Sequence, residues 1–375
     1  MTSWASTRIS ELFDAQYPIV QGPFGGGVST VALATAVSNA GGLGSFGGHH
    51  LQPHQLDATV GALAAATGRP FAVNLWVPTA DQPRGIDEET FRTGLARLRP
   101  WYDALGVDLP EYRPQTLPDF DEQVEVVLER RPRVFSFVFG IPSPRVLAEC
   151  RRRGIVTVGA ATNLDEGRAL EAGGVDVVVA SGNEAGGHRP SFLRPAEESV
   201  ATGPLTAQLS SELRVPVIAA GGIADGRGIA AAFALGAEGA QLGTAFLATE
   251  QSAAPAVHRE VLHTDRARYT MLTHAFSGRH GRGIRNDFLD ALATDPADIP
   301  PYPQQLWLTA PLRAAGTERA NPEVLFLYAG QGAPLLDKAH TDAGELVRFL
   351  VTDTDRVFAR LADRSSRRRD EAGAR

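Results

Sequence analysis

Short apolar segments alternate with amphipathic, helix-type patterns through the first 250 residues of the chain. The apolar segments are rich in Val, Ile and Ala and are too short for helices, which indicates strands. Strands that are apolar throughout and separated by helices are typical of a parallel sheet covered on both faces. The predicted strands are residues 17–21, 43–46, 71–76, 133–139, 155–159, 175–180, 216–220 and 239–242.

The number and spacing of these strands predict the fold class. Eight β-α units within about 235 residues fit the size of an α/β protein of the (β/α)8 TIM-barrel type. An open, doubly wound sheet is the alternative. It is disfavoured because no Gly-x-Gly-x-x-Gly turn follows the first strand, where a nucleotide-binding half of such a sheet would begin.

The rest of the chain divides into three predicted parts around this barrel. Residues 1–250 form the barrel and include an insertion at about 79–131. Residues 251–363 form a helical cap packed on the barrel, and the highly charged residues 364–375 form a disordered tail. The helices expected in the insertion and the cap are 88–105, 121–129, 253–262, 318–327 and 343–361.

Two strand ends carry matched glycines. Gly221 and Gly222 end the seventh strand, and Gly243, followed by Thr244, ends the eighth. Glycine lets backbone N–H groups approach a ligand closely, and the start of a following helix favours an anion. In TIM barrels a phosphate site often forms after strands seven and eight. The alternative is that these glycines only make tight turns. A phosphate site is favoured because two neighbouring strands, one β-α unit apart, both end in glycine.

A histidine ends the glycine-rich loop after the sixth predicted strand. His188 follows Gly186 and Gly187, at the end of the barrel where such enzymes keep their catalytic groups. Neutral imidazole can accept a proton near physiological pH, so His188 is predicted to be a general base. The alternative is a histidine that only hydrogen-bonds the loop. Catalysis is favoured because this loop reaches the same barrel mouth as the glycine-ended strands.

Composition and charge exclude several other classes of protein. The chain has 375 residues and a formal net charge of −7, so a nucleic acid is not an expected partner. The single cysteine, Cys150, excludes an intrachain disulfide and a multi-cysteine metal site, and no metal is expected. No segment has the character of a secretory signal or reaches membrane-spanning length. These features predict a cytoplasmic protein without a membrane partner.

Six short segments stand out in order along the chain: PIVQGP (18–23), AGGLG (40–44), FAVNL (71–75), EAGGH (184–188), AAGGIADGRG (219–228) and QLGTAF (241–246). Together they resemble segments of the nitronate monooxygenase family, formerly called 2-nitropropane dioxygenases, and of its FMN-binding barrel relatives. Any one of these segments is a weak signal, but six in the family's order are a specific one, and a looser similarity continues through residues 277–286.

The resemblance implies that FMN binds at the barrel mouth, with His188 as the catalytic base beside the substrate. The phosphate would lie on backbone donors of the two glycine-ended strands, which agrees with Lys338 being the only lysine. Gly186 would leave room for the cofactor. For Asn74 the alternative stays open that it only satisfies backbone groups. The residues implied to contact FMN are Gln21, Gly22, Pro23, Asn74, Ser181, Gly186, Gly221, Gly222, Gln241, Gly243 and Thr244.

Two positions depart from the family pattern. Ser181 stands where many relatives have glutamine, and its shorter side chain would lose a hydrogen bond to the flavin or replace it by water. Pro190 stands where a glycine is usual, and it stiffens the loop after His188. Neither change prevents FMN binding, but both bear on which substrate is used.

The resemblance also implies a reaction, the oxidation of alkyl nitronates by O2 to a carbonyl compound and nitrite. The nitronate would give one electron to FMN, and His188 would remove the α-proton where the neutral nitroalkane is used. Two alternatives stay open. One is an FMN-dependent enoyl-thioester reductase that uses NADH or NADPH, and the other is a flavin-binding barrel without turnover. The sequence does not determine the oligomeric state, for which a homodimer is one candidate.

Overall fold

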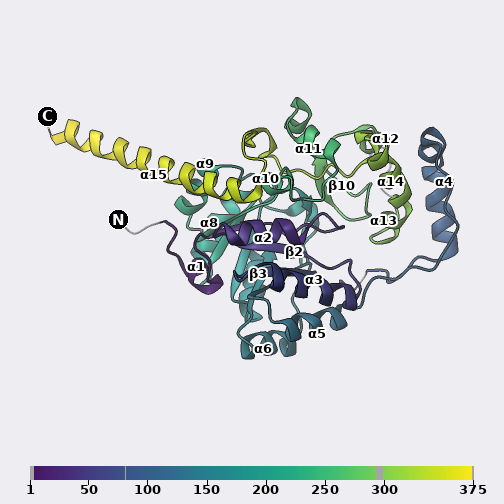
Figure 1. The fold of residues 1–375 in the computed structure, drawn as a ribbon, viewed down its shortest axis with the longest axis horizontal. Coiled ribbons are helices and arrows are strands. Elements are labelled where there is room, and N and C mark those ends of the chain that lie inside the picture. Colours follow the sequence, from purple (N-terminus) through teal and green to yellow (C-terminus); the bar gives the residue numbers. More distant parts are fainter. Residues whose placement is uncertain (1–3, 81, 293–298, 374–375) are drawn as a thin grey trace.

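The eight predicted strands form one parallel sheet. The computed structural model describes residues 4–80, 82–292 and 299–373. The order of the strands is β1-β9-β8-β6-β5-β4-β3-β2, and a bridge between Val20 and Leu43 joins the two end strands. The sheet therefore closes into a barrel (Figure 1), which confirms the predicted (β/α)8 fold and excludes the open sheet. The strands are β1 (Ile19–Gln21), β2 (Gly44–Gly47), β3 (Phe71–Trp76), β4 (Val134–Val138), β5 (Val156–Ala161), β6 (Val177–Ser181), β8 (Val217–Ala220) and β9 (Gly239–Leu242).

The interior of the barrel is apolar because alternate residues of each strand point inward. One hydrophobic cluster joins Val134, Val156 and Val177 to Ile9 and Phe13 of helix α1 (Arg8–Phe13). These valines begin their strands, so α1 covers the amino-terminal end of the barrel. The carboxyl-terminal end is left for a functional site.

Helices that follow the strands cover the outside of the barrel. The last helix of the chain, α15 (Ala343–Gly373), packs against two of them, α9 and α2. Its Val347 and Leu350 are buried in the same cluster as Ile229 of α9 and Val37 of α2. It therefore occupies the place of the eighth barrel helix (Figure 1). The others are α2 (Val31–Asn39), α3 (Pro53–Ala66), α5 (Phe120–Arg130), α6 (Pro144–Arg152), α7 (Leu164–Ala172), α8 (Thr202–Glu212) and α9 (Gly226–Ala234).

The position of α15 differs from the domain organisation expected from the sequence. Residues 343–361 were expected in the cap and 364–375 in a disordered tail, but α15 continues to Gly373 and belongs with the barrel. The reason is that α10 (Thr244–Leu247), which follows the last strand, is too short to cover the gap between α9 and α2. In the described part of the chain, no helix has both the length and the apolar character that crossing a membrane requires.

The cap, residues 251–342, contains strands as well as helices. Strand β11 (Gly281–Ile284) pairs antiparallel with β10 (Thr270–Thr273) and with β7 (Gly187–His188). Because β7 lies in the barrel loop after β6, the segment that carries His188 is a strand of the cap sheet. The other cap elements are α11 (Ala256–Leu262), η2 (Asp265–Arg268), α12 (Asp287–Leu292), α13 (Gln304–Leu308), α14 (Ala310–Glu318), η4 (Pro322–Val324) and η5 (Ala333–Leu335).

The predicted insertion divides between the barrel and the cap. Helix α5 packs against α3 on the barrel, whereas α4 (Glu88–Leu105) packs against α13 and α14 of the cap (Figure 1). A Cβ atom at Gly94 would clash with Leu308. The Tyr102 hydroxyl donates to the carbonyl oxygen of Leu308 at 2.8 Å. The insertion therefore supplies one helix to each body.

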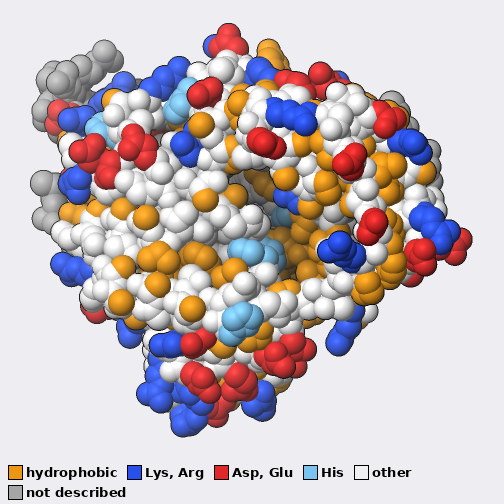
Figure 2. Space-filling view, turned by 45° about the vertical axis from the view of Figure 1, so that its right-hand side comes forward, with side chains coloured by type: hydrophobic (Ala, Val, Ile, Leu, Met, Phe, Trp, Pro, Cys, Tyr) orange, Lys and Arg blue, Asp and Glu red, His pale blue; other side chains and the backbone are white. Residues whose placement is uncertain are grey.

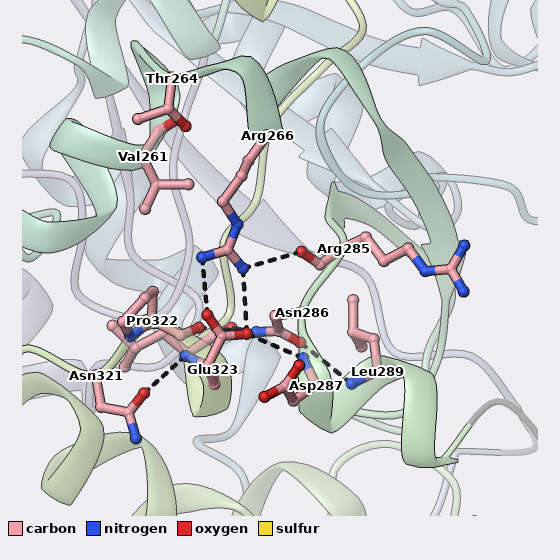
Figure 3. A network of polar contacts seen from close by, with 11 residues as sticks. Val261, Thr264, Arg266, Arg285, Asn286, Asp287, Leu289, Asn321, Pro322 and Glu323 are labelled. Atoms are coloured by element: carbon pink, nitrogen blue, oxygen red, sulfur yellow. Dashed lines mark hydrogen bonds and ion pairs between the residues drawn. The ribbon is translucent and has the colours of Figure 1, made fainter.

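The helix predicted at residues 318–327 does not form. Helix α14 ends at Glu318, and the 3-10 turn η4 follows. The backbone N–H of Glu323 donates to Asn321 Oδ1 at 3.0 Å, and the Glu323 carboxylate accepts from Arg266 at 2.8 and 3.1 Å (Figure 3). An ion pair with a distant part of the cap thus holds a turn where the local pattern favours a helix.

Candidate active site

A cavity of about 480 Å³ lies at the carboxyl ends of the barrel strands, beneath the cap. Figure 2 shows a face of the molecule with a hollow that is bordered by hydrophobic and histidine side chains. Of the residues predicted from the sequence, all but Gln21 line the cavity. They are Gly22, Pro23, Asn74, Ser181, Gly186, His188, Gly221, Gly222, Gln241, Gly243 and Thr244. The structure therefore brings the ends of five strands and the His188 loop to one place.

Gln21 has a different position from the one expected. Its side chain is fully buried, and Oε1 accepts a hydrogen bond from the Ser45 backbone N–H at 2.8 Å. Its Nε2 donates to the carbonyl oxygen of Gly22. These bonds tie β1 to β2, where the barrel closes, so Gln21 positions Gly22 and does not itself line the cavity.

The glycine ends of β8 and β9 form one wall of the cavity. Gly221 and Gly222 have φ values of +117° and +70°, which residues with a side chain rarely adopt. The N–H groups of Gly222 and Gly243 donate to no backbone carbonyl within the described residues. Helix α10 begins directly after Gly243. This wall therefore presents backbone donors to the cavity, an arrangement that suits an anion.

A cap loop, residues 328–332, closes over this wall. The Gly330 N–H donates to Thr244 Oγ1 at 2.9 Å, and the Gln331 N–H donates to the Glu184 carbonyl at 2.9 Å. A Cβ atom at Gly332 would lie 2.5 Å from the Gly222 carbonyl oxygen. This loop was not predicted as part of the site, although its Gly-Gln-Gly pattern is a sequence signal of close backbone approach.

The same loop explains why residue 186 is glycine. A Cβ atom at Gly186 would lie 2.5 Å from the backbone nitrogen of Gly330 and 2.6 Å from the carbonyl carbon of Ala329. The missing side chain therefore makes room for the cap loop. This corrects the expectation that Gly186 leaves room for a cofactor, although its backbone does line the cavity.

His188 is held through one of its two ring nitrogens. It pairs with Gly281 in the cap sheet, and its Nε2 lies 2.8 Å from Ser277 Oγ and 3.2 Å from the Tyr328 hydroxyl. The Ser277 hydroxyl donates to the Arg279 carbonyl oxygen at 3.1 Å. Nδ1 makes no hydrogen bond to a described residue and is not sealed inside the protein. Nδ1 is therefore the nitrogen available to a ligand.

Burial and two positive charges keep His188 neutral. Desolvation, followed by the Arg279 and Arg189 guanidinium groups, lowers the pKa of His188 from 6.5 to about 3. The imidazole therefore has a free lone pair at physiological pH but is a weak base. The same two positive charges attract a negatively charged ligand.

Two buried charged side chains fix the loop on both sides of the histidine. Arg189, only 2% exposed, donates to the carbonyl oxygens of Gly182 and Ala185 at 2.6 and 2.7 Å. Glu166, on α7, is fully buried and accepts from the Phe192 backbone N–H at 2.7 Å. Neither residue was predicted, because their partners are backbone groups that only the folded loop places nearby.

Asn74 and Ser181 both line the cavity. Asn74 Nδ2 donates to Ser136 Oγ on β4 at 3.0 Å, and the side chain also lines the cavity. Ser181 lines the cavity at the end of β6, and its hydroxyl makes no hydrogen bond to the described residues. The partner of the Asn74 amide is thus a neighbouring side chain and not the backbone groups of the alternative reading.

Aromatic rings form a further wall of the cavity. Trp76 meets the rings of Phe139, His188 and Tyr302 at centroid distances of 4.9, 5.2 and 5.4 Å. The Arg279 guanidinium lies 3.9 Å from the Phe139 ring centroid and 4.8 Å from that of Tyr302. This wall gives the cavity an apolar side with a positive charge at its edge.

The closed barrel and the cavity at its carboxyl end define a (β/α)8 enzyme fold with a wall of backbone donors. The family described as nitronate monooxygenase matches residues 6–353 of the chain. A probable nitronate monooxygenase from Staphylococcus aureus (strain Newman) is 35% identical over 357 residues, which cover 95% of this chain and 99% of that protein. The chain therefore belongs to the nitronate monooxygenase family and is an oxidoreductase.

Two solved structures share the whole architecture, including the cap. A nitroalkane oxidase from Streptomyces ansochromogenes has a TM-score of 0.84 and 36% identity, with 94% of this chain and 99% of that chain covered. FabK from Thermotoga maritima has a TM-score of 0.74 and 28% identity, with coverage of 96% and 99%. The cap is thus part of a fold that these proteins have in common.

Proposed function

We propose that the cavity binds FMN and that the enzyme oxidises alkyl nitronates with O2 to a carbonyl compound and nitrite. One observation carries the proposal: a wall of backbone donors and a neutral histidine flanked by arginines meet in one cavity. Membership of the family supports the general activity. FMN, the substrate and the products are the specific part of the proposal.

The residues present fit FMN. The backbone N–H groups of Gly222 and Gly243 and the Thr244 hydroxyl would hold the phosphate without a lysine. The oxygen of that hydroxyl already accepts from Gly330, which leaves its hydrogen to donate. Gly22, Pro23, Asn74, Ser181 and Gln241 line the remainder of the cavity and would contact the ring system. Bound FMN supplies the electron acceptor that no side chain provides.

The chain's own residues attract, orient and shield the substrate. Arg279 and Arg189 favour negative charge beside His188, which suits a nitronate better than a neutral nitroalkane. Because the Ser277 hydroxyl hydrogen is directed at a carbonyl, its oxygen accepts from His188 Nε2–H. The lone pair is then on Nδ1, where His188 would take the α-proton of a nitroalkane. The resulting imidazolium would be disfavoured by both arginines, so nitronates are the preferred substrates.

Anaerobic mixing tests this function. The FMN-loaded protein is mixed with ethyl nitronate, NADH or NADPH, and the flavin absorbance spectrum is followed. Rapid conversion to one-electron-reduced flavin by ethyl nitronate supports the proposal. Two-electron reduction, seen as bleaching, by NADH or NADPH alone would support an enoyl-thioester reductase, and no spectral change with any of them would support a non-catalytic barrel. A colourless protein that takes up no added FMN would contradict the cofactor assignment.

A further inference from the structure

His49 is a second histidine of the cavity, and the proposed function gives it no role. It follows β2, is 8% exposed and lines the cavity. Its ring lies flat on Trp76, with centroids 3.6 Å apart and planes within 3°. Trp76 in turn meets His188 edge-on at 5.2 Å. The indole therefore contacts both imidazoles, and both histidines line the cavity.

The surrounding structure seats this ring closely. A Cβ atom at Gly25 would lie 2.6 Å from His49 Cε1, so the glycine is needed for the imidazole to fit. Gln123 Nε2 donates to the carbonyl oxygens of Gly48, His49 and Leu51 at 3.3, 3.2 and 2.7 Å, which fixes the backbone. The ring is therefore held by its backbone, by the stacked indole on one face and by the close approach of Gly25 at its edge.

The hydrogen-bond partners of His49 indicate where its proton resides. Nδ1 is buried and has no partner within the described residues. Buried N–H groups without an acceptor are rarer than acceptors without a donor, so the proton belongs on Nε2. Burial, together with His50, His188 and Arg279, lowers the pKa of His49 well below its usual value, so the ring is neutral. Nε2 makes no hydrogen bond to a described residue and is not sealed off, which leaves an N–H donor for a ligand.

We propose that His49 donates this Nε2–H to an oxygen of the substrate's planar nitronate group. His49 then binds the oxygen end of the substrate while His188 lies across Trp76 beside the carbon end. This assignment rests on the proposed function, because it takes the nitronate as the ligand. The neutral imidazole donates its N–H without transferring a proton to the nitronate. A hydrogen bond to a charged oxygen is also stronger in a buried site than in water.

The variant His49→Phe tests the donor because phenylalanine keeps a flat ring for the contact with Trp76 and has no ring nitrogen. Nitrate serves as the probe, since it is a planar, unreactive oxyanion, and its Kd is read from the change in flavin absorbance. We expect the Kd for nitrate and the KM for ethyl nitronate to rise roughly 10- to 100-fold, the usual effect of losing a hydrogen bond to a charged group. His49→Gln, which retains an N–H donor, should recover part of the loss.

The neighbouring His50 provides the matched control, because it does not line the cavity. His50→Phe should leave the Kd for nitrate unchanged, and FMN content should stay at the wild-type level in all three variants. Unchanged nitrate binding in His49→Phe, an equal loss in His49→Gln, or no nitrate binding by the wild type would overturn the inference. A different outcome would be a wild-type protein that binds nitrate through His49 but is inactive on ethyl nitronate. That result would contradict the proposed function and leave His49 as a donor to oxyanions.

Discussion

Replacing His188 with asparagine should separate proton abstraction from every other contribution of the site. Asparagine keeps a polar side chain of similar size but has no basic nitrogen. With a pKa of about 3, His188 is protonated in only about one molecule in ten thousand at pH 7, so nearly all of the enzyme has the base form. Loss of a general base typically costs roughly 10²–10⁴ in rate, or about 2.7–5.5 kcal/mol. Activity on neutral nitroethane should fall by that factor.

Pre-formed ethyl nitronate has already lost its α-proton, so its oxidation should be much less affected. The variant loses the one Nε2–H, which Ser277 and Tyr328 share as partners, and the net value of one hydrogen bond, about 0.5–1.5 kcal/mol, corresponds to a roughly two- to tenfold change. FMN content should stay near that of the wild type, because the phosphate wall is built from β8 and β9. Oxygen consumption with each substrate form, together with the flavin absorbance, measures all three quantities.

The control is His54→Asn, the same substitution at an exposed position of α3, which should change neither activity. Equal losses on nitroethane and ethyl nitronate with FMN retained would refute proton abstraction and leave an electrostatic role for His188. Parallel loss of FMN would show that His188 is structural. A wild-type enzyme without activity on either form would favour the enoyl-thioester reductase.

Three further substitutions test separate parts of the argument. Gly222→Asp places a carboxylate beside the phosphate wall at a residue with φ of +70°, so FMN affinity should fall at least tenfold by equilibrium dialysis; unchanged affinity would show that the phosphate binds elsewhere. Arg279→Gln removes a positive charge that lowers the pKa of His188 and attracts an anionic substrate. The pKa of His188, measured by NMR, and the KM for ethyl nitronate should therefore both rise; if neither changes, the Arg279 charge does not act on the site. His258 is buried and its pKa is lowered to about 4, so the unfolded chain binds its proton first and stability is lost as pH falls from 6.5 toward 4. Between pH 7 and pH 5 the free energy of unfolding should fall by about 2 kcal/mol because of His258. In His258→Gln, urea unfolding should no longer show this fall, and an unchanged pH dependence would contradict the lowered pKa of His258.

Local pattern was sufficient to predict the strands and most of the helices around the barrel. Apolar runs of Val, Ile and Ala form strands wherever both faces of a sheet are covered, and that condition holds all around a (β/α)8 barrel. Gly221, Gly222, Gly243 and His188 line one cavity because the carboxyl ends of parallel strands meet at one mouth. Those parts of the site depend on the order of the elements, which the sequence contains.

The remaining features depend on contacts between segments far apart in the chain. The first part of α15, with Val347 and Leu350, becomes the eighth barrel helix because the helix after β9 is four residues long and leaves a gap between α9 and α2. Gln21 turns away from the cavity because a fully buried amide must find partners, and it finds them where β1 meets β2. His49 gains an unoccupied N–H only from the burial around it. By itself, the sequence determined the barrel and the mouth where its chemistry resides, since both follow from local periodicity. Tertiary packing decided which polar groups find hydrogen-bond partners within the protein and which are left for a ligand. The reason is that the partners of a buried group are its neighbours in space, whatever their distance along the chain.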